Sequence, residues 1–258
     1  MEALRVRAYA KLNLGLRVVG RRANGYHLLQ STMVAVDLAD TLSFTRQRAG
    51  VTVSCRPGLG ISPEKNLVSR AVSAALSRAG AHTGVKVVVH KHIPPGAGLG
   101  GGSSDAAAAL SGTNLLLDLG LSQAQLAELA LTLGADVPFF LGPSPAWAEG
   151  VGERLRPSPA RLPPAFLLLV PPRRCPTSQV FQRYAELGIP YSHPSAPPVF
   201  PDYRNDLYPA ALEVYPELSQ YLELLDQAEA LGVGMTGSGS GLFAAYLDRA
   251  AAQGAKER

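Results

Sequence analysis

The segment that most constrains the fold is the run PPGAGLGGGSSDAAAAL, residues 94–110. Its glycines lack a Cβ, so the backbone can adopt positive φ and approach a ligand closely, at a large cost in chain entropy. They are Gly96, Gly98, Gly100, Gly101 and Gly102. Ser103, Ser104 and Asp105 are good N-cap residues, and the alanines that follow favour a helix. The segment is therefore predicted to be a loop that leads directly into a helix.

The start of such a helix favours a bound anion. Its first N–H groups are unpaired, and its dipole places about half an elementary charge there, which suits phosphate. The preceding stretch GVKVVVH, residues 84–90, is rich in β-branched side chains and predicts a strand. Gly/Ser runs are often flexible linkers, but a linker is seldom placed between a strand and a strong helix. We therefore interpret the run as a phosphate-binding loop.

Two common phosphate-binding motifs explain the run poorly. A Walker-type loop needs a lysine after its last glycine, whereas Gly102 is followed by Ser103 and Ser104. The dinucleotide fingerprint GxGxxG does match the glycines, and Asp118 lies near the position of its ribose-binding acid. However, two prolines separate the strand from the first glycine, and Asp118 falls in a predicted helix. A dinucleotide-binding oxidoreductase is therefore kept only as a less favoured alternative.

Composition indicates a globular protein of two domains. The chain has 258 residues, of which 47% are apolar and 17% charged. Proline becomes frequent from residue 156, which predicts domains at 1–155 and 156–258. The N-terminus has charges where a signal peptide would be apolar, and the longest apolar run, Ala165–Val170, is too short to span a bilayer. We expect a cytoplasmic protein without a membrane partner.

The net charge of +4 raises the question of nucleic-acid binding. Lysine and arginine occur as short pairs, such as Arg21–Arg22 and Arg173–Arg174, rather than as a basic stripe interleaved with aromatic residues. This pattern predicts no nucleic-acid partner and suits a small anionic ligand equally well. Cys55 and Cys175 lack the spacing of a zinc site or a disulfide framework.

The stretch RAYAKLNLGLRVV, residues 7–19, predicts a half-buried strand. Its apolar residues alternate with polar ones, which places Lys11 and Asn13 side by side on the polar face. The turn signal Asn24–Gly25 follows, with Tyr26 and His27 at its end.

Further elements follow from caps and periodicity. The stretch GADVPFFL places Asp136 between a helix end and an apolar segment that Pro138 stiffens. Near the C-terminus, GVGMTGSGSGLFAAYL predicts a glycine-rich turn that leads into a strand. Helices are predicted at Asn66–Ala79, Ser104–Leu119, Ser122–Leu133 and near Ala210–Ala230, with a strand at Ala165–Val170.

Taken in order, these motifs resemble those of the GHMP kinase superfamily and, within it, the 4-diphosphocytidyl-2-C-methyl-D-erythritol kinases. The motifs are AKLNLGL, GYH, KNL, PPGAGLGGGSSDAA, LGADVPFF, GVGERL, NDL and MTGSGSG, between Lys11 and Phe243. The resemblance implies an α+β fold of two domains, the first like domain 2 of ribosomal protein S5 and the second ferredoxin-like. The family usually continues after the last glycine motif into a further helix and strand, whereas this sequence ends at AAAQGAKER.

The resemblance also implies an activity. Such kinases use ATP to phosphorylate the 2-hydroxyl of 4-diphosphocytidyl-2-C-methyl-D-erythritol in the non-mevalonate (MEP) isoprenoid pathway. A GHMP kinase for another small alcohol, such as mevalonate or homoserine, and a non-catalytic nucleotide-binding module remain alternatives. The only partner expected is the small-molecule substrate, and the protein is expected to be a monomer or a weak homodimer.

Catalytic and ATP-binding residues follow from the matched motifs. Asp136 would be the base that accepts the hydroxyl proton, and Lys11 would keep this carboxylate ionised and stabilise the alkoxide. Ser103 or Ser104 would reach Mg²⁺, while Asn66 and Lys91 would lie on the adenine side. The residues implied to wrap the ATP phosphates are Pro94, Pro95, Gly96, Ala97, Gly98, Leu99, Gly100, Gly101, Gly102, Ser103 and Ser104.

Substrate-binding residues are implied in the same way. Tyr26 and Phe181 would stack on the cytosine ring, His27 would hydrogen-bond its edge, and Asn13 would hold the substrate near Lys11. The alternative is that these aromatic residues belong to the core and that His27 is an ordinary turn residue. The last glycine motif would bring backbone N–H groups towards the substrate diphosphate or, alternatively, would only form a tight turn. Its predicted contacts are Thr236, Gly237, Ser238 and Gly239.

Overall fold

The protein is described here by a computed structural model that covers residues 4–257. Its strands and helices confirm the α+β class. The chain forms two compact units. The first unit contains the residues up to Lys11 together with Ala35–Pro95 and Gly100–Pro143, and the second contains Leu12–Val34, Gly96–Leu99 and the residues from Ser144 onward. These units are not the contiguous stretches 1–155 and 156–258, because residues 12–34, 96–99 and 144–155 belong to the second unit. The division at residue 156 stays a prediction about sequence domains.

Two long strands, β1 (Leu4–Arg21) and β2 (His27–Gln47), contribute residues to both units and pair with each other. The first unit adds β3 (Val51–Arg56), α1 (Leu67–Ala79), β4 (Gly84–His90), α2 (Gly101–Leu117), α3 (Gln123–Leu133) and the 3₁₀ helix η1 (Pro138–Leu141). The second unit adds β5 (Ala146–Gly150), β6 (Arg154–Pro157), β7 (Ala165–Leu169), α4 (Thr177–Glu186), α5 (Tyr208–Val214), α6 (Leu218–Asp226), β8 (Gly232–Met235), β9 (Leu242–Tyr246) and α7 (Arg249–Glu257).

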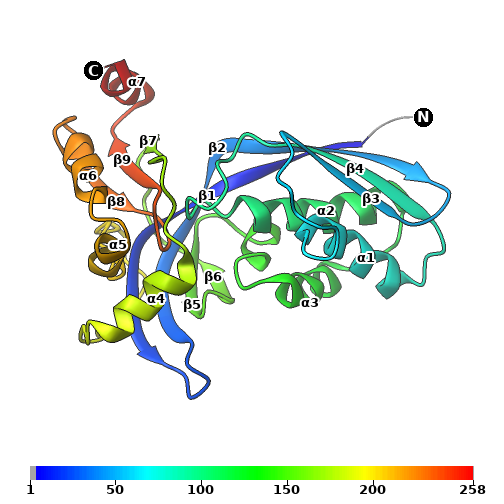
Figure 1. Cartoon of the computed structure of the whole chain (residues 1–258), viewed down its shortest axis with the longest axis horizontal. Coiled ribbons are helices and arrows are strands. Elements are labelled where there is room, and N and C mark those ends of the chain that lie inside the picture. The colour runs from blue at the N-terminus through cyan, green and yellow to red at the C-terminus, as the bar shows by residue number, and fades with distance from the viewer. Residues whose placement is uncertain (1–3, 258) are drawn as a thin grey trace. The chain divides into compact units, whose positions relative to one another are not determined.

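The first unit is a sheet covered on one face by helices. Strand β4 pairs with β2 in antiparallel fashion and with β3 in parallel. Because parallel neighbours need a crossover, α1 connects β3 to β4, and α1, α2 and α3 lie together on one side of the strands (Figure 1). Phe44 and Val87 from the sheet and Ala109 and Leu110 from α2 are fully buried in the shared core. This packing fixes the position at which α2 begins.

Helix ends agree with the predictions for α1 and α3. The side chain of Asn66 caps α1 by accepting a hydrogen bond from Val68 N at 2.9 Å, and Ser122 forms a capping box with Gln125. Helix α2 differs, because it begins at Gly101 rather than at Ser104 and ends at Leu117. Its N-cap is Gly100, in the left-handed region at φ 69°, and no side chain caps it. The three predicted N-cap residues after the glycines therefore lie inside the helix, and Asp118 is its C-cap rather than an interior residue.

The second unit contains a sheet in the order β7-β9-β8, with both pairs antiparallel. The central strand β9 is buried along its whole length. Within this unit, residues Leu29–Met33 of β2 also pair with β5, which in turn pairs with β6. The single helix predicted near residues 210–230 is wrong. It is two helices, α5 and α6, because Pro216 lacks an N–H group and disfavours helical geometry at Tyr215.

Strand β1 is more buried than its alternation predicted. Its apolar face is buried at Ala8, Ala10, Leu12, Leu14 and Leu16, as expected, but Lys11 and Asn13 on the other face are only 3% and 6% exposed. The strand is therefore enclosed on both faces at its centre. Among residues 4–257, no helix is long and apolar enough to cross a membrane.

Helix α2 packs so closely on the sheet that one of its glycines is expected to be irreplaceable. A Cβ on Gly112 would lie 2.5 Å from Cζ of Phe44, which is fully buried. We expect Gly112→Ala to lower the free energy of unfolding by about 1–3 kcal/mol, the usual cost of overpacking a core. Guanidinium denaturation measures this change. The control Gly254→Ala, in α7 with open space around its Cβ position, should be neutral or stabilising by up to about 1 kcal/mol. Equal unfolding midpoints for the two variants would contradict this account.

Candidate functional site

The glycine-rich loop contributes to both compact units. Pro94 and Pro95 end one segment of the first unit, Gly96–Leu99 belong to the second unit, and the first unit resumes at Gly100. Gly96, Gly98 and Gly100 have φ of 74°, 71° and 69°, a region in which L side chains are strained. The prediction of a glycine-dependent loop conformation is confirmed.

In the first unit, the start of α2 lies against Lys11. A Cβ on Gly100 would lie 2.9 Å from Cζ of Phe140 and 3.0 Å from Cγ of Lys11, so only glycine fits. The first hydrogen bond of the helix runs from Ser104 N to Gly100 O at 2.9 Å. The N–H groups of the residues between these two have no partner within the helix and receive no side-chain cap. A bare helix start of this kind favours a bound anion, so the predicted phosphate contact at this position stays a prediction.

Lys11 and Asp136 form the ion pair that the matched motifs implied. Lys11 Nζ lies 3.9 Å from Asp136 Oδ2, and the lysine side chain is 4% exposed whereas the aspartate is 40% exposed. The aspartate lies in the turn between α3 and η1, next to the buried Val137. Burial lowers the pKa of Lys11 from its usual value, and the charge of Asp136 only partly opposes this effect. A buried cation thus stands beside a carboxylate that a ligand can reach.

A second buried lysine, Lys91, lies behind the start of α2. Its ammonium group donates to Asp105 Oδ2 at 2.7 Å and to Asp40 Oδ2, and all three side chains are at most 7% exposed. Asp40 also accepts from the backbone of Ile93 at 2.9 Å, just before the loop. The Asp40–Lys91–Asp105 cluster therefore ties the start of the loop and α2 to β2 and to the end of β4. Sequence reasoning gave neither carboxylate this role, although Asp105 is the one charged residue in the run 94–110.

Burial and the charges within this cluster shift the pKa values of Asp105 and Lys91. Burial raises the pKa of Asp105 to about 7, although Lys91 opposes the shift. Burial alone would lower the pKa of Lys91, but Asp105 and Asp40 outweigh it and raise that pKa. The predicted contact of Lys91 with adenine stays a prediction, because its ammonium group is already held by two carboxylates.

Three further predicted ATP contacts lie near the start of a helix, Asn66 at α1 and Ser103 and Ser104 at α2. The Asn66 side chain is engaged in capping α1, so its contact with adenine also stays a prediction. Ser104 is only 2% exposed, whereas Ser103 in the same turn is half-buried and more accessible to a ligand.

In the second unit, the two glycine-rich loops pack backbone against backbone. A Cβ on Gly98 would lie 2.3 Å from Thr236 O, and one on Gly241 would lie 2.3 Å from Ala97 O. Gly241 N donates to Ala97 O at 3.1 Å. The turn Thr236–Gly241 and the segment Gly96–Leu99 therefore form one assembly, which we call the paired glycine loops.

Thr236 joins this assembly to β1. Its hydroxyl accepts from Asn13 N at 3.0 Å and donates to Gly98 O at 3.3 Å, and the residue is fully buried. The Asn13 side chain donates to Ser31 Oγ at 3.0 Å. Both residues were predicted to bind substrate, and the structure brings them together, but these polar groups bind other parts of the protein.

Thr177 and Asn205, which lie outside the turn 236–241, hold the rest of this turn through hydrogen bonds. Ser238 Oγ lies 2.8 Å from Thr177 Oγ1, and the carbonyl groups of Met235 and Gly237 each accept from Asn205 Nδ2 at 2.8 Å. Gly239 lies so close to Met235 and Cys175 that a Cβ there would be 2.9 Å from the Met235 sulfur. Sequence reasoning missed Asn205, because the NDL motif contributed to the family resemblance but no contact was predicted for its residues.

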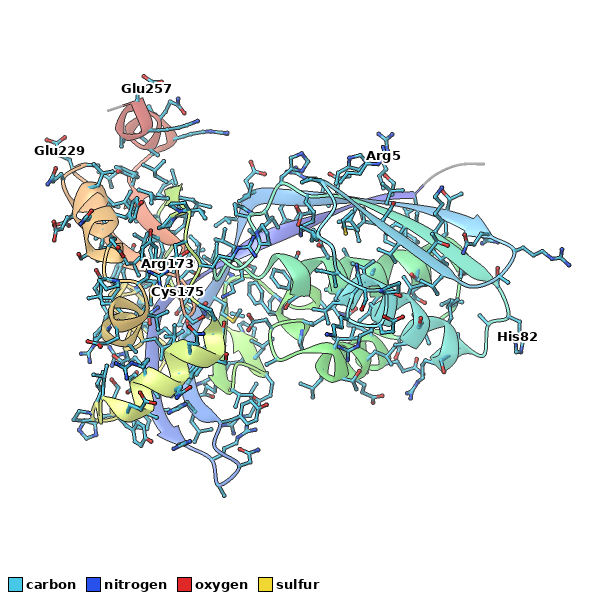
Figure 2. All side chains as sticks on the ribbon, in the orientation of Figure 1. Arg5, His82, Arg173, Cys175, Glu229 and Glu257 are labelled. Atoms are coloured by element: carbon cyan, nitrogen blue, oxygen red, sulfur yellow. The ribbon has the colours of Figure 1, made fainter. Side chains whose placement is uncertain are left out.

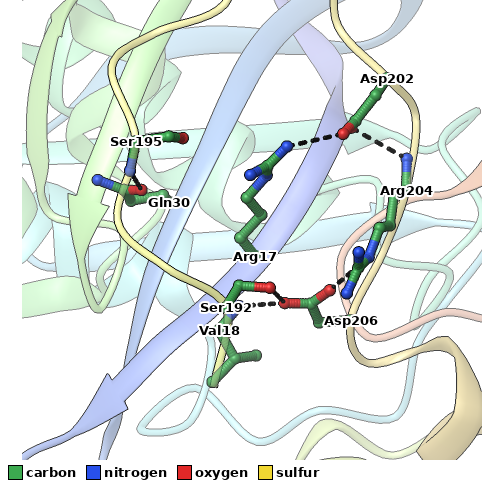
Figure 3. A network of polar contacts seen from close by, with 8 residues as sticks. All are labelled: Arg17, Val18, Gln30, Ser192, Ser195, Asp202, Arg204 and Asp206. Atoms are coloured by element: carbon green, nitrogen blue, oxygen red, sulfur yellow. Dashed lines mark hydrogen bonds and ion pairs between the residues drawn. The ribbon is translucent and has the colours of Figure 1, made fainter. Parts of the chain in front are cut away.

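The neighbour of Asn205 anchors this segment to β1 (Figure 3). Asp206 accepts from Val18 N at 2.9 Å, from Ser192 Oγ at 2.6 Å and from Arg204 Nε at 3.0 Å. Arg17 and Asp202 form an ion pair at 2.8 Å beside it, and Gln30 accepts from Ser195 N. The NDL motif thus fixes the proline-rich segment so that Asn205 can hold the glycine turn.

His27 and Phe181 form one wall of a pocket in the second unit. Their rings stack with centroids 5.3 Å apart at an angle of 22°, and Tyr184 packs edge-on against His27. The pocket has a volume of about 420 Å³ and is lined by Arg21, Gly25, His27, Ser178, Phe181, Gln182, Ala185 and Glu186. Tyr26 is 65% exposed and does not line it. The structure therefore joins two of the three predicted base-binding residues.

The pocket carries a polar group suited to a base edge. His27 Nε2 is buried and has no hydrogen-bond partner among residues 4–257. Burial and the nearby charge of Arg21 lower the pKa of His27, which favours the neutral ring. A neutral imidazole can offer a donor and an acceptor to a heterocycle.

Comparison with known proteins decides the family. Residues 66–142 match the GHMP kinases N terminal domain, and residues 202–258 match the GHMP kinases C terminal domain. A 4-diphosphocytidyl-2-C-methyl-D-erythritol kinase of Nitrosospira multiformis is 43% identical over 252 residues, which are 96% of this chain and 84% of that protein. Its counterpart in Geobacter metallireducens is 41% identical over 100% of this chain and 94% of that protein. The chain belongs to the 4-diphosphocytidyl-2-C-methyl-D-erythritol kinase family.

Solved structures agree with this family. The crystal structure of a 4-(cytidine 5'-diphospho)-2C-methyl-D-erythritol kinase has 37% sequence identity and a TM-score of 0.86, over 98% of this chain and 94% of that one. A mevalonate kinase of Methanococcus jannaschii has a TM-score of 0.71 at 13% identity, over 99% of this chain and 94% of that one, which shows a shared fold alone. The α+β GHMP kinase fold is confirmed, and the dinucleotide-binding oxidoreductase alternative is wrong.

The buried cluster predicts a pH dependence of stability. Because the folded pKa of Asp105 lies near 7 and its usual value is 3.8, the folded state binds more protons than the unfolded state between about pH 4 and 7. The contribution of Asp105 to the free energy of unfolding should therefore fall as pH rises through this window. We expect Asp105→Asn to remove that slope, measured by urea unfolding at several pH values. The exposed Asp37→Asn is the matched control, and an unchanged slope in Asp105→Asn would refute the assignment.

Proposed function

We propose that this chain transfers the γ-phosphoryl group of ATP to the 2-hydroxyl of 4-diphosphocytidyl-2-C-methyl-D-erythritol, a step of the non-mevalonate isoprenoid pathway. The observation that carries the proposal is the Lys11–Asp136 pair beside the uncapped start of α2, in a chain of this family. Phosphoryl transfer needs little covalent chemistry from the protein and depends on positioning and on stabilising negative charge.

The triphosphate would bind the glycine-rich loop and the start of α2. The N–H groups between Gly100 and Ser104 point out of the helix start, where the dipole favours negative charge. Gly100 must lack a Cβ for Lys11 to lie beside it. The bare backbone therefore brings the phosphates close to a buried cation.

The acceptor hydroxyl would lie between Lys11 and Asp136. The Asp136 carboxylate would accept the hydroxyl proton as the new P–O bond forms, a transfer that a loose transition state requires only late. The Lys11 ammonium group, which is shielded from solvent, would stabilise the developing alkoxide. Asp136 contributes position and charge rather than basicity.

The cytidine would occupy the pocket of His27 and Phe181. Its ring would stack on this pair, and His27 Nε2, which is buried without a partner among the described residues, would bond the base edge. Mevalonate and homoserine have no heterocycle to fill such a pocket. This pocket therefore favours the cytidine-linked substrate over another small alcohol.

Mg²⁺ is proposed to enter with ATP. Within residues 4–257 no group of three or more His, Cys, Asp or Glu side chains could hold a metal ion. Mg²⁺ in kinases is commonly held by one or two protein oxygens and by substrate phosphates, so the accessible Ser103 hydroxyl in the first turn of α2 fits such a role, and Ser104 fits it less well. When bound, the ion would neutralise charge on the phosphates. Cytoplasmic location, absence of a nucleic-acid partner and a monomeric or weakly dimeric state stay predictions.

Asp136 is the direct test of the proposed reaction. We expect Asp136→Asn to lower kcat by about 10²–10⁴, the usual contribution of a general base, with little change in the KM for ATP. The measurement is ADP formation with ATP, Mg²⁺ and the cytidine-linked substrate, compared with mevalonate and homoserine as acceptors. Asp37→Asn, on the surface, should behave as wild type. Full activity of Asp136→Asn, or turnover of mevalonate instead, would refute the proposal.

Lys11 should impose an alkaline limit on activity. Because burial lowers its pKa, we expect kcat to fall at a lower pH than the ordinary lysine value of 10.5 would give. NMR titration of ¹³C-labelled lysine side chains measures this pKa directly. In Asp136→Asn the pKa of Lys11 should fall further, since the carboxylate raises it. An increase in that variant would contradict the pairing.

A further inference from the structure

Arg174 lies against the phosphate-binding loop and has no role in the activity described above. It follows β7 in the stretch PPRRCPT, where it forms one of the arginine pairs of the sequence. Both Arg174 and Gly96–Leu99 belong to the second unit, so their placement is defined within one compact body.

The contact with the loop is close. A Cβ on Gly96 would lie 2.8 Å from Cδ of Arg174 and 3.4 Å from its Nε, so the arginine stem crosses the bare backbone of this glycine. Arg174 and Gly96 are both exposed. Among residues 4–257 no carboxylate pairs with the Arg174 guanidinium. A solvent-accessible cation therefore stands at the edge of the loop proposed to bind phosphate.

The backbone that carries Arg174 is fixed to the paired glycine loops. The next residue, Cys175, is buried, and its Sγ would lie 3.5 Å from a Cβ on Gly239. Thr177 hydrogen-bonds Ser238 of the same turn. Figure 2 labels Cys175 together with Arg173 on this segment. Arg174 thus projects from a fixed support rather than from a free loop.

The neighbouring Arg173 takes a different direction. Its guanidinium carbon lies 5.2 Å above the ring of Tyr215, in a cation–π contact. Only Arg174 of the pair reaches the glycine loop. Its planar guanidinium can bind two phosphate oxygens at once, with shorter and stronger hydrogen bonds than a neutral donor makes.

We propose that Arg174 binds a phosphate group of a bound ligand at Gly96 and is an additional phosphate-binding residue of this enzyme. The inference rests on the proposed function, which supplies two sources of that chemistry, the triphosphate of ATP and the diphosphate of the acceptor. A methionine at position 174 would keep the stem on Gly96 and remove the charge.

The test compares Arg174→Met with Arg173→Met, two variants that each lose one positive charge at adjacent exposed positions. Calorimetric titration with ATP and, separately, with CDP as the diphosphate probe gives a dissociation constant for each ligand. We expect Arg174→Met to weaken the binding of one ligand by about tenfold, as the loss of one charge-assisted hydrogen bond implies, and Arg173→Met to change it by less than about twofold. Arg174→Lys should recover part of the loss, because it restores the charge without the planar fork.

The ligand that is affected identifies the source of the phosphate. Unchanged binding of both ATP and CDP in Arg174→Met, or equal losses in the two methionine variants, would overturn the inference. Thermal unfolding of the Arg174 variants should match the wild type, since that side chain is exposed, whereas Arg173→Met should be slightly less stable because it loses the cation–π contact with Tyr215. These titrations measure binding and need no turnover. An inactive wild-type protein would therefore refute the proposed function, whereas the dissociation constants alone would decide the role of Arg174.

Discussion

The second unit depends on the absence of two side chains. Gly98 and Gly241 allow carbonyl oxygens of the opposite loop to approach to 2.3 Å from the positions where Cβ atoms would stand. No other residue permits that approach, so the paired glycine loops exist only with glycine at both positions. Thr236 then connects Gly98 to Asn13 of β1, and Asn205 holds the turn from the other side. The segment Gly96–Leu99 of the glycine-rich loop is therefore held in place by contacts within the second unit.

The first unit keeps two lysines, Lys11 and Lys91, buried near the uncapped start of α2. Lys11 pairs with Asp136, a carboxylate that is 40% exposed to solvent. Lys91 pairs with two buried carboxylates, so its charge is balanced inside the protein. Burial is costly for both lysines, and the partner of Lys11 is accessible to solvent whereas the partners of Lys91 are not. The difference between these lysines is decided by their partners rather than by their exposure.

Local signals predicted the parts of the fold that local chemistry controls. The bounds of α1, the cap of α3, the strand before the glycine loop and the turn before β9 follow from residues within a few positions of each end. The start of α2 was placed too late, because preferred N-cap residues were present but Gly100 took the position instead. The break at Pro216 could have been read from the sequence by the rule that proline interrupts helices.

The site was predictable only in part. The Lys11–Asp136 pair came from the resemblance to a family, since alternation placed Lys11 on a polar face but could not bring residue 136 to it. Asp40 and Asn205 bind partners 30 or more positions away in the sequence, and Asp105 binds Lys91 inside a buried cluster. No periodicity in the sequence predicts such contacts. Tyr26 is 65% exposed and does not line the pocket of His27 and Phe181, so its predicted stacking on the base stays a prediction.

The uncapped start of α2 has a consequence for the resting protein. The N-cap residue of a helix usually has a side-chain oxygen that accepts a hydrogen bond from the first turn. The N-cap of α2 is Gly100, which has no side chain to act as an acceptor. A nucleotide phosphate would supply the missing acceptor, so the ligand would act as the N-cap of α2. Amide hydrogens in that turn would then exchange with solvent more slowly in the loaded enzyme, and the nucleotide would count among the groups that hold the fold together.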